Sequence, residues 1–389
     1  MLTIIKQPEV YSPDYKGKKD ILIAGEKIIA IEEYIDCSSL SIDVHVVDGK
    51  NKLVVPGFID SHVHIIGGGG EGSYKTRTPE LMLSQATLAG VTTIVGVIGT
   101  DGTSRTMPDL IAKAKGLNEE GITCYVHTGS YQVPIKSMTG SIQSDFMLIE
   151  QIIGVGEVAI SDHRSSQPTV DELSRIAAEA RVGGMLSGKA GIVNVHVGDS
   201  QDKLTLLEKV IDSTDIPITQ FIPTHMNRTI DLFNAGIKYA KKGGYLDFTT
   251  STIPKFLDEG EIKCSKALKV LLEKGISLQQ ITFTSDAQGS LPAFDDQGKF
   301  IGLQIGDMKS LFSEVRDAVL QEEVSLEQAL HVITKSPANA LKLNGKGELK
   351  IGNDADLVLL SQDLEIETVV SRGQVMVEGG TAVVKGTFE

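Results

Sequence analysis

Apolar and polar residues alternate near both ends of the chain, and this pattern predicts half-buried β-strands. The alternating segments, separated by Gly-, Asp- and Lys-containing turns, are residues 20–31, 44–49, 356–360, 367–370 and 374–378. We therefore predict a small β-sandwich domain built from both chain termini, with residues 1–52 as its N-terminal part and 344–389 as its C-terminal part.

The middle of the chain, residues 53–343, has a different pattern in which strand-like apolar runs alternate with stretches of helical periodicity. The eight runs are residues 58–64, 91–97, 123–129, 156–162, 192–198, 221–225, 245–250 and 281–286. Eight strands alternating with helices over such a length predict an α/β fold of the (β/α)8 TIM-barrel type. An open, doubly wound sheet is the competing architecture.

Ionisable residues collect at the C-terminal ends of these runs, where barrel enzymes keep their chemistry. His62 and His64 are one residue apart on an extended strand, so both imidazoles point to the same side and can bind one metal ion. The later strand ends add further possible ligands, namely Glu157, His196, His225 and Asp286. This set exceeds what one tetrahedral ion needs, and two metal ions that share a bridging carboxylate would use all of it. For each histidine alone, a hydrogen-bonded core or surface role is the alternative. His127 and His163 also lie at strand ends, and we expect supporting or structural roles for them.

Composition narrows the classes of partner. The formal net charge of -14 and the lack of a Lys/Arg-rich block argue against nucleic acid or an anionic membrane surface. The three cysteines lie far apart, so neither a disulfide framework nor a thiolate zinc site is expected. With neither an export signal nor a long apolar run in the sequence, we expect a cytoplasmic protein.

The motifs resemble a known family. Residues 56–64, together with His196, His225 and Asp286, resemble the amidohydrolase superfamily of metal-dependent hydrolases. Within it, the isoaspartyl dipeptidase family is resembled by residues 66–71, 99–101, 129–134, 160–165 and 223–228. Residues 352–358 look like the superfamily's return into its small β domain.

The resemblance implies hydrolysis of β-aspartyl dipeptides by a hydroxide that bridges two Zn²⁺ ions per subunit, in a homo-oligomer. It implies that Asp286 transfers the proton and that Tyr131 donates a hydrogen bond to the developing oxyanion. Glu71 would hold the substrate's amino group, and Arg164 and Arg228 would bind its carboxylates. For each arginine alone, a solvated surface position or an ion pair with Asp162 or another neighbour is the alternative. The remaining pocket residues implied are Gly69, Gly70, Thr100 and Ser290.

One position departs from the family pattern. Where familiar members have a carboxylated lysine that bridges the metals, this chain has Glu157, in a segment that is one residue longer. We expect Glu157 to be the bridge, with a single-metal site or an exposed strand-end glutamate as alternatives. The metal itself stays open among zinc, iron and manganese.

Two other functions remain as alternatives. One is a related amidohydrolase that acts on N-acyl amino acids or cyclic amides, and the other is a non-catalytic scaffold.

Overall fold

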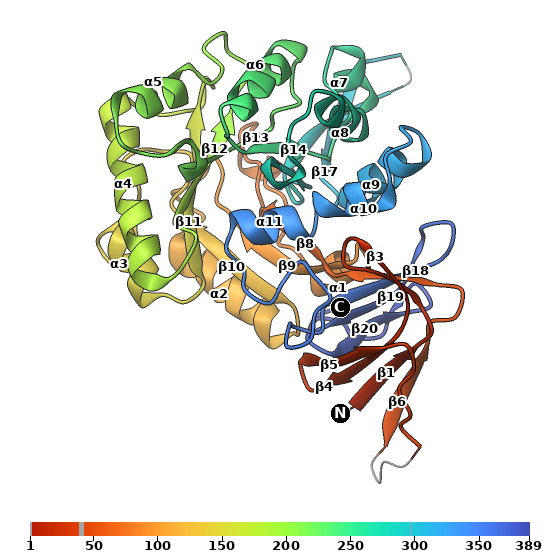
Figure 1. Cartoon of the computed structure of the whole chain (residues 1–389). Helices are drawn as coiled ribbons and strands as arrows, with labels where there is room; N and C mark the ends of the chain where they lie inside the picture. The colour runs from red at the N-terminus through yellow and green to blue at the C-terminus, as the bar shows by residue number, and fades with distance from the viewer. Residues whose placement is uncertain (1, 39–42, 296) are drawn as a thin grey trace.

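A curled parallel sheet forms the centre of the molecule in this computed structural model, which describes residues 2–38, 43–295 and 297–389 (Figure 1). Its six neighbouring strands, in order, are β8 (Phe58–Val63), β9 (Val91–Gly96), β10 (Thr123–Thr128), β11 (Ile152–Ile160), β12 (Ile192–Val197) and β13 (Phe221–Thr224). They are rich in β-branched residues and buried on both faces, as expected of parallel strands covered by helices.

Two further strands, β14 (Leu246–Thr249) and β15 (Ile281–Thr284), form a parallel pair beside the six. Backbone hydrogen bonds connect this pair to both ends of the larger sheet. Met226 N donates to Asp247 O at 3.1 Å, and His64 N donates to Ala287 O at 3.0 Å. The predicted α/β class with a parallel sheet is therefore confirmed, and each predicted run overlaps a strand. The largest shift in a strand start is at β11, which begins at Ile152 rather than at residue 156.

Helices surround this sheet. Short 3₁₀ helices lie in three of the connections between strands and helices, at Tyr74–Thr76, Ile218–Gln220 and Leu278–Gln280. They are α1 (Leu83–Thr87), α2 (Met107–Glu119), α3 (Ile142–Leu148), α4 (Val170–Ser187), α5 (Thr205–Ser213), α6 (Ile230–Lys241), α7 (Pro254–Asp258), α8 (Cys264–Glu273), α9 (Ser310–Leu320), α10 (Leu326–His331) and α11 (Lys335–Ala340). On α4, Leu173, Ile176, Ala177 and Ala180 are buried at helical spacing. Within the described ranges, no helix is long and apolar enough to cross a membrane.

The two chain ends lie together in two further sheets. One contains β5 (Lys27–Glu32), β4 (Asp20–Ala24), β1 (Leu2–Lys6) and β6 (Val44–Asp48). The other contains β21 (Thr381–Ala382), β20 (Gln374–Glu378), β19 (Ile366–Ser371), β18 (Leu357–Leu360), β7 (Leu53–Pro56), β2 (Glu9–Tyr11) and β3 (Tyr15–Lys18). Ile5, Ile21, Val54 and Leu357 belong to one apolar cluster that joins these sheets.

The strand β7 pairs with β18 and β2, so residues 53–56 lie in the terminal sheet, although we grouped them with the barrel. The domain boundaries themselves stay predictions, and residues 1 and 39–42 of the first expected segment lie outside the described residues.

A hairpin that the sequence reading did not predict lies beyond β15, formed by β16 (Ser290–Phe294) and β17 (Phe300–Ile305). Apolar and polar residues do not alternate clearly in this segment. In the structure, Phe300, Ile301, Leu303 and Ile305 of β17 are all exposed by 44% or more, so neither face of the strand packs into a core. The hairpin forms part of the wall of the pocket described below.

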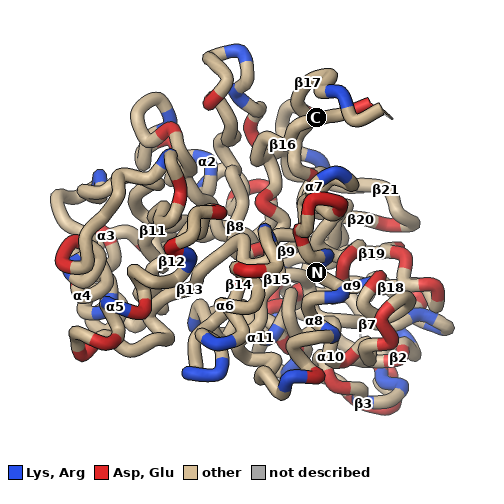
Figure 2. Tube along the Cα trace, turned by 90° about the horizontal axis from the view of Figure 1, so that it is seen from above, with Lys and Arg blue, Asp and Glu red and all other residues tan. Residues whose placement is uncertain are grey.

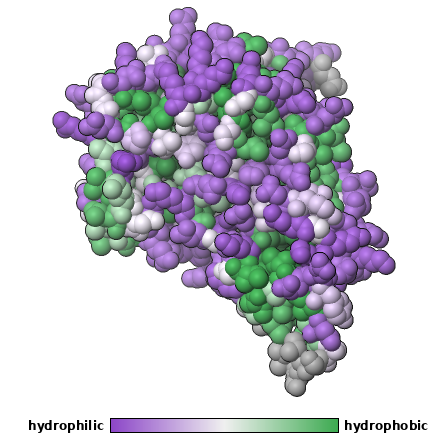
Figure 3. Space-filling model, in the orientation of Figure 1, coloured by the Kyte–Doolittle hydropathy of each residue, from purple (hydrophilic) through white to green (hydrophobic). Residues whose placement is uncertain are grey.

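Charged residues of both signs are interspersed along the whole trace (Figure 2). On the face shown in Figure 3, hydrophilic side chains predominate, and apolar ones gather at the side where Figure 1 places α3 and α4. Leu148, Met185 and Leu186 of these helices are exposed by 73%, 67% and 60%. In Figure 2, the acidic residues are distributed along the whole trace and alternate with basic ones.

Candidate active site

Five of the six predicted metal ligands form sets with metal-ligand spacing at the C-terminal ends of the parallel strands, and His196 lies beside them, in contact with Glu157 but outside both sets. His62 lies on β8 with His64 directly after it, Glu157 lies on β11 and His196 on β12. His225 follows β13 directly, and Asp286 lies two residues after β15. Because the C-terminal ends of parallel strands meet on one side of a sheet, residues far apart in sequence share one site.

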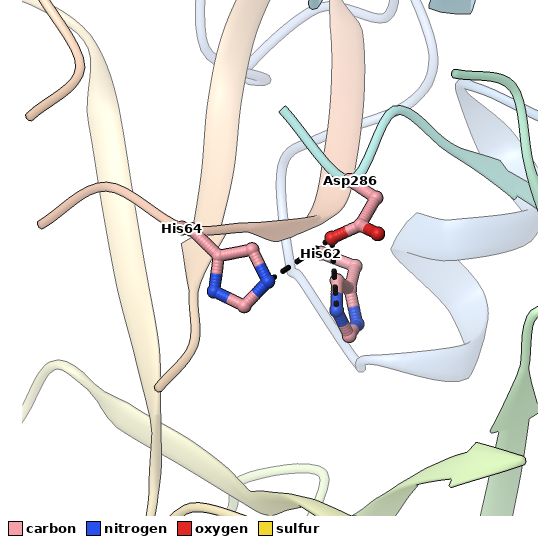
Figure 4. A group of neighbouring side chains, drawn as sticks. All are labelled: His62, His64 and Asp286. Carbon is pink, nitrogen blue, oxygen red and sulfur yellow. Dashed lines mark ion pairs between the residues drawn. The ribbon is translucent and has the colours of Figure 1, made fainter. Parts of the chain in front are cut away.

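His62, His64 and Asp286 form the first group of ligands (Figure 4). Asp286 Oδ1 is 3.1 Å from His64 Nε2 and 3.7 Å from His62 Nε2. The two histidines reach the carboxylate from the same strand, as the His-x-His spacing predicts. Their donor atoms lie close enough together to hold one metal ion.

Glu157 lies between this group and a second one. Its Oε1 is 3.5 Å from His64 Nε2, and its Oε2 is 3.2 Å from His196 Nδ1 and 3.7 Å from His225 Nε2. The same Oε2 is 3.3 Å from His62 Nε2, and His62, Glu157 and His225 form a second set with metal-ligand spacing. One carboxylate therefore faces ligands of both groups.

A β-bulge on β11 gives Glu157 its position. Val155 pairs with Val193 of β12, but Val158 pairs with Val195, so β11 has one residue more than β12 across this interval. A bulge of this kind re-aims side chains locally and is common beside active sites. The extra residue inferred in this segment thus corresponds to an observed irregularity of the strand.

The buried polar atoms of the site fit a metal ion. Among the described residues, no hydrogen-bond partner is found for His62 Nε2, Glu157 Oε1 or Asp286 Oδ1, although all three atoms are buried. Buried polar atoms without a partner are costly, and a divalent cation would satisfy them together.

The pKa values of His62 and Glu157 also indicate that the site favours a positive charge. Burial alone would lower the pKa of His62, but the Glu157 carboxylate raises it to about 10. Burial alone would raise the pKa of Glu157, but His62 and the hydrogen bonds from His196 and His225 lower it well below its usual range. A positive charge among these side chains is therefore strongly stabilised.

Two histidine rings are oriented by neighbours that are not ligands. Asn194 Oδ1 is 3.1 Å from His62 Nδ1, and Thr249 Oγ1 is 2.6 Å from His225 Nδ1. Both contacts leave the Nε2 atom of the ring facing Glu157, which is how metal-binding histidines are commonly oriented.

A cavity of about 910 Å³ opens above these ligands, with His64 and Asp286 in its wall. Of the predicted substrate residues, it is lined by Gly69, Glu71, Thr100, Tyr131, Arg164, Arg228 and Ser290. Gly70 does not line it, and its N–H instead donates to Thr76 O at 3.2 Å within the loop.

Tyr131 is buried beside the ligands, with its hydroxyl 2.6 Å from His196 Nδ1. Burial raises the pKa of this phenol well above its ordinary value. Tyr131 thus stays protonated at neutral pH and able to donate a hydrogen bond.

Arg164 forms a two-pronged ion pair with Asp162, with Nε 3.0 Å from Oδ1 and Nη2 2.7 Å from Oδ2. Its Nη1 is 3.5 Å from Glu71 Oε1, and the same oxygen accepts from Thr100 Oγ1 at 2.8 Å. Arg164 therefore forms the ion pair with Asp162 that is the alternative to substrate binding, and its guanidinium group also lines the cavity.

Arg228 approaches the same ring nitrogen of His196 as Arg164 does, with Nη1 3.1 Å from His196 Nε2 and 3.3 Å from Val197 O. The third arginine of the cavity wall, Arg105, donates instead to the backbone oxygens of Ile66 and Thr78. The glutamates of the wall are Glu71, Glu259 and Glu261.

The sequence reading missed several contributors. Asp162 was considered only as an ion-pair partner, yet its Oδ2 is 2.9 Å from His196 Nε2. Phe256, Phe300 and Leu303 line the outer part of the cavity and carried no sequence signal, because their apolar side chains read as core. His163, for which we expected a supporting role, is 89% exposed at its side chain.

Comparisons with known proteins agree with this geometry. The sequence profile of the Amidohydrolase family matches residues 53–376. A crystal structure of beta-aspartyl dipeptidase from Fervidobacterium islandicum AW-1, in complex with a beta-Asp-Leu dipeptide, is 45% identical and superposes with a TM-score of 0.91 over 98% of this chain and 97% of that one. Another structure of beta-aspartyl dipeptidase from that organism is 42% identical, with a TM-score of 0.89 over 98% of both chains. The dihydroorotase of Lactobacillus gasseri is 24% identical over 92% of this chain and 89% of its own length.

Proposed function

The chain belongs to the amidohydrolase family and is a hydrolase, and from this premise we propose that it cleaves β-aspartyl (isoaspartyl) dipeptides as a metal-dependent peptidase. The observation that carries the proposal is the match of charges in the cavity. A β-aspartyl dipeptide has two carboxylates and one ammonium group. Of the charged side chains in the cavity wall, Arg164 and Arg228 contact the ligand His196 and Glu71 lies beside Arg164, so these three supply two cations and one anion next to the ligand cluster.

In this proposal two Zn²⁺ ions would bind per chain: His62, His64 and Asp286 would hold one ion, His196 and His225 would hold the other, and Glu157, in place of a carboxylated lysine, would be a ligand to both. When bound, such ions lower the pKa of a water molecule and polarise the substrate carbonyl. This assignment is supported by the position of the Glu157 carboxylate, which has one oxygen near His64 and the other near His196.

The protein's own side chains do the remaining work. Although burial alone would raise the pKa of Asp286, its contact with His64 keeps that pKa below the usual range, so the carboxylate is ionised at neutral pH. Asp286 accepts the proton of the attacking water and delivers it to the departing amine. Tyr131 donates its O–H to the carbonyl oxygen as negative charge develops there.

Substrate recognition rests on opposite charges. Arg164, held in place by Asp162, and Arg228 bind the two carboxylates, while Glu71 binds the α-amino group. Gly69, Thr100 and Ser290 complete the pocket in this proposal, and Gly70 supports the loop that carries Gly69.

The whole-molecule proposals follow the same resemblance. We propose that the eight strands close into a (β/α)8 barrel over residues 53–343 and that the terminal segments 1–52 and 344–389 form a small β-sandwich domain. The backbone hydrogen bond from His64 N to Ala287 O supports closure of the barrel, because it joins the segment directly after β8 to the segment directly after β15. We also propose a cytoplasmic homo-oligomer.

A panel of substrates tests the function. Zinc-loaded protein, with metal counted per chain, is assayed on β-Asp-Leu, α-Asp-Leu, N-acetyl-leucine and dihydroorotate. We expect turnover of β-Asp-Leu alone. Dihydroorotate is included because of the similarity to dihydroorotase, and turnover confined to it or to N-acetyl-leucine would overturn the proposal.

Glu71→Gln tests the charge match within the same assay. Losing one charged hydrogen bond to the ammonium group should lower kcat/KM for β-Asp-Leu by roughly 10- to 100-fold. Glu179→Gln is the matched control, because Glu179 is exposed on α4, away from the cavity. Equal kcat/KM in Glu71→Gln and the control would remove Glu71 from the substrate site.

A further inference from the structure

Asp247, on β14, is a fully buried carboxylate that neither the metal site nor the substrate site uses. It accepts hydrogen bonds from three threonine hydroxyls. Thr224 Oγ1 is 2.5 Å from its Oδ2, Thr284 Oγ1 is 2.7 Å from the same oxygen, and Thr282 Oγ1 is 2.6 Å from its Oδ1. Asp247 therefore connects β13 and β15 through the strand between them.

The positions of these threonines give the contact its importance. Thr224 directly precedes His225, and Thr284 lies two residues before Asp286. Each of the two segments that Asp247 holds thus leads into a ligand of a different group. Their spacing at the site depends on how β13 and β15 sit against β14.

Folding alone does not explain a carboxylate here. Within the described residues, Asp247 has no Lys or Arg as an ion-pair partner, and burying a charge is costly even when it is hydrogen-bonded. An apolar side chain would fill the same space at lower cost. Three converging charge-assisted hydrogen bonds do what an apolar contact cannot, because they fix direction as well as distance.

We propose that Asp247 is a positioning residue that holds His225 and Asp286 at the separation a metal pair requires. The inference rests on the proposed metal-dependent function. Supporting groups of this kind commonly affect metal affinity by 10- to 100-fold when they are removed.

The test measures zinc affinity by competition with a chromophoric chelator, using metal-free full-length protein. Asp247→Asn keeps the shape of the side chain but loses the charge and one acceptor, and we expect zinc affinity to fall by 10- to 100-fold. Asp145→Asn is the control. Asp145 is equally buried and accepts from Thr128 Oγ1 at 2.6 Å, but it lies on α3, away from the ligand segments.

The outcomes are distinct. Weakened zinc binding in Asp247→Asn, with Asp145→Asn near the wild type, supports the inference. Wild-type affinity in Asp247→Asn, or an equal loss in both variants, overturns it. A wild-type protein that binds no zinc would instead overturn the proposed function.

Should Asp247→Asn fail to fold, Thr224→Val and Thr284→Val each remove one of the hydrogen bonds while preserving volume. Each is expected to weaken zinc binding at least threefold. Thr93→Val is the control, because Thr93 is buried and its hydroxyl has no partner among the described residues. Wild-type affinity in both threonine variants would overturn the inference.

Discussion

Glu157 is the residue that faces both ligand groups. A glutamate carries two oxygens, as a carbamate does, on a shorter stem. The bulge between Val155 and Val158 alters the path of β11 at this point. We propose that the bulge and the glutamate act together, because the altered path helps the shorter side chain to face both groups.

We predict that Glu157→Gln lowers the metal content below two ions per chain after dialysis. The amide is neutral and offers one carbonyl oxygen in place of a charged pair of oxygens. Zinc affinity should fall at least 10-fold, the lower end of the loss seen when supporting groups alone are removed. Elemental analysis against Glu179→Gln checks this, and two retained ions at wild-type affinity would rule out Glu157 as the bridge.

His127 leads to a prediction about pH. It is buried, neither ring nitrogen has a partner among the described residues, and burial lowers its pKa to about 3. The neutral form therefore stabilises the fold above the unfolded-state value of about 6.5, and that stability is lost as pH falls toward 3.

Between pH 7.5 and pH 5, His127 should cost the folded state about 2 kcal/mol of unfolding free energy. His127→Leu removes the titrating group, so its loss of stability over this interval should be smaller by that amount. Urea unfolding of both metal-free proteins at the two pH values measures the difference, and parallel losses would contradict the assignment.

At the scale of elements, α4 shows how local sequence sets helix limits. Thr169 Oγ1 accepts from Glu172 N at 3.3 Å, while Glu172 Oε2 accepts from Thr169 N at 2.8 Å, which forms a capping box. At the other end, Gly188 takes a φ of 71°, a left-handed conformation that ends the helix and favours glycine.

We predict that Thr169→Ala lowers the unfolding free energy by about 1 kcal/mol, because the first turn of α4 loses a partner for its N–H groups. Thr169→Ser retains the hydroxyl and should restore most of the loss. Chemical denaturation of the three proteins provides the comparison, and an unchanged midpoint for Thr169→Ala would show that the cap is not needed.

At the scale of the whole molecule, Lys346 connects the central sheet to the sheets of the chain ends. Its side chain is 3% exposed, and its Nζ lies 2.9 Å from Asp354 Oδ2 and 2.7 Å from Thr123 Oγ1 of β10. It also pairs with the buried Asp356. Residues from two distant parts of the chain, β10 and the segment just before β18, therefore share one cation.

Lys346→Met should lower the unfolding free energy by roughly 3–5 kcal/mol, because it leaves the buried Asp356 without its cation. Lys350→Met is the control, since Lys350 is exposed. The two variants are compared by urea unfolding, and a loss below about 1 kcal/mol for Lys346→Met would mean that water or a neighbour replaces the cation.

The sequence by itself determined the alternation of strands and helices, the β-rich ends and the residues that gather at the C-terminal strand ends. These features follow from periodicity and from the rule that parallel strands end on one side, so His62, His64, His196, His225 and Asp286 were predictable as neighbours. Tyr131 and Arg164 were predictable for a different reason, because they lie in short motifs that resemble those of the family.

Only the tertiary structure decided the contacts that leave no periodic pattern of apolar and polar residues in the sequence. The bulge at Glu157 depends on the register between β11 and β12, and the three threonines around Asp247 come from strands separated by up to 60 residues. The hairpin from Ser290 to Ile305 has no buried face of its own, so it gave no pattern to detect. Such features are set by packing between distant segments, whereas local sequence records only the face that each segment buries.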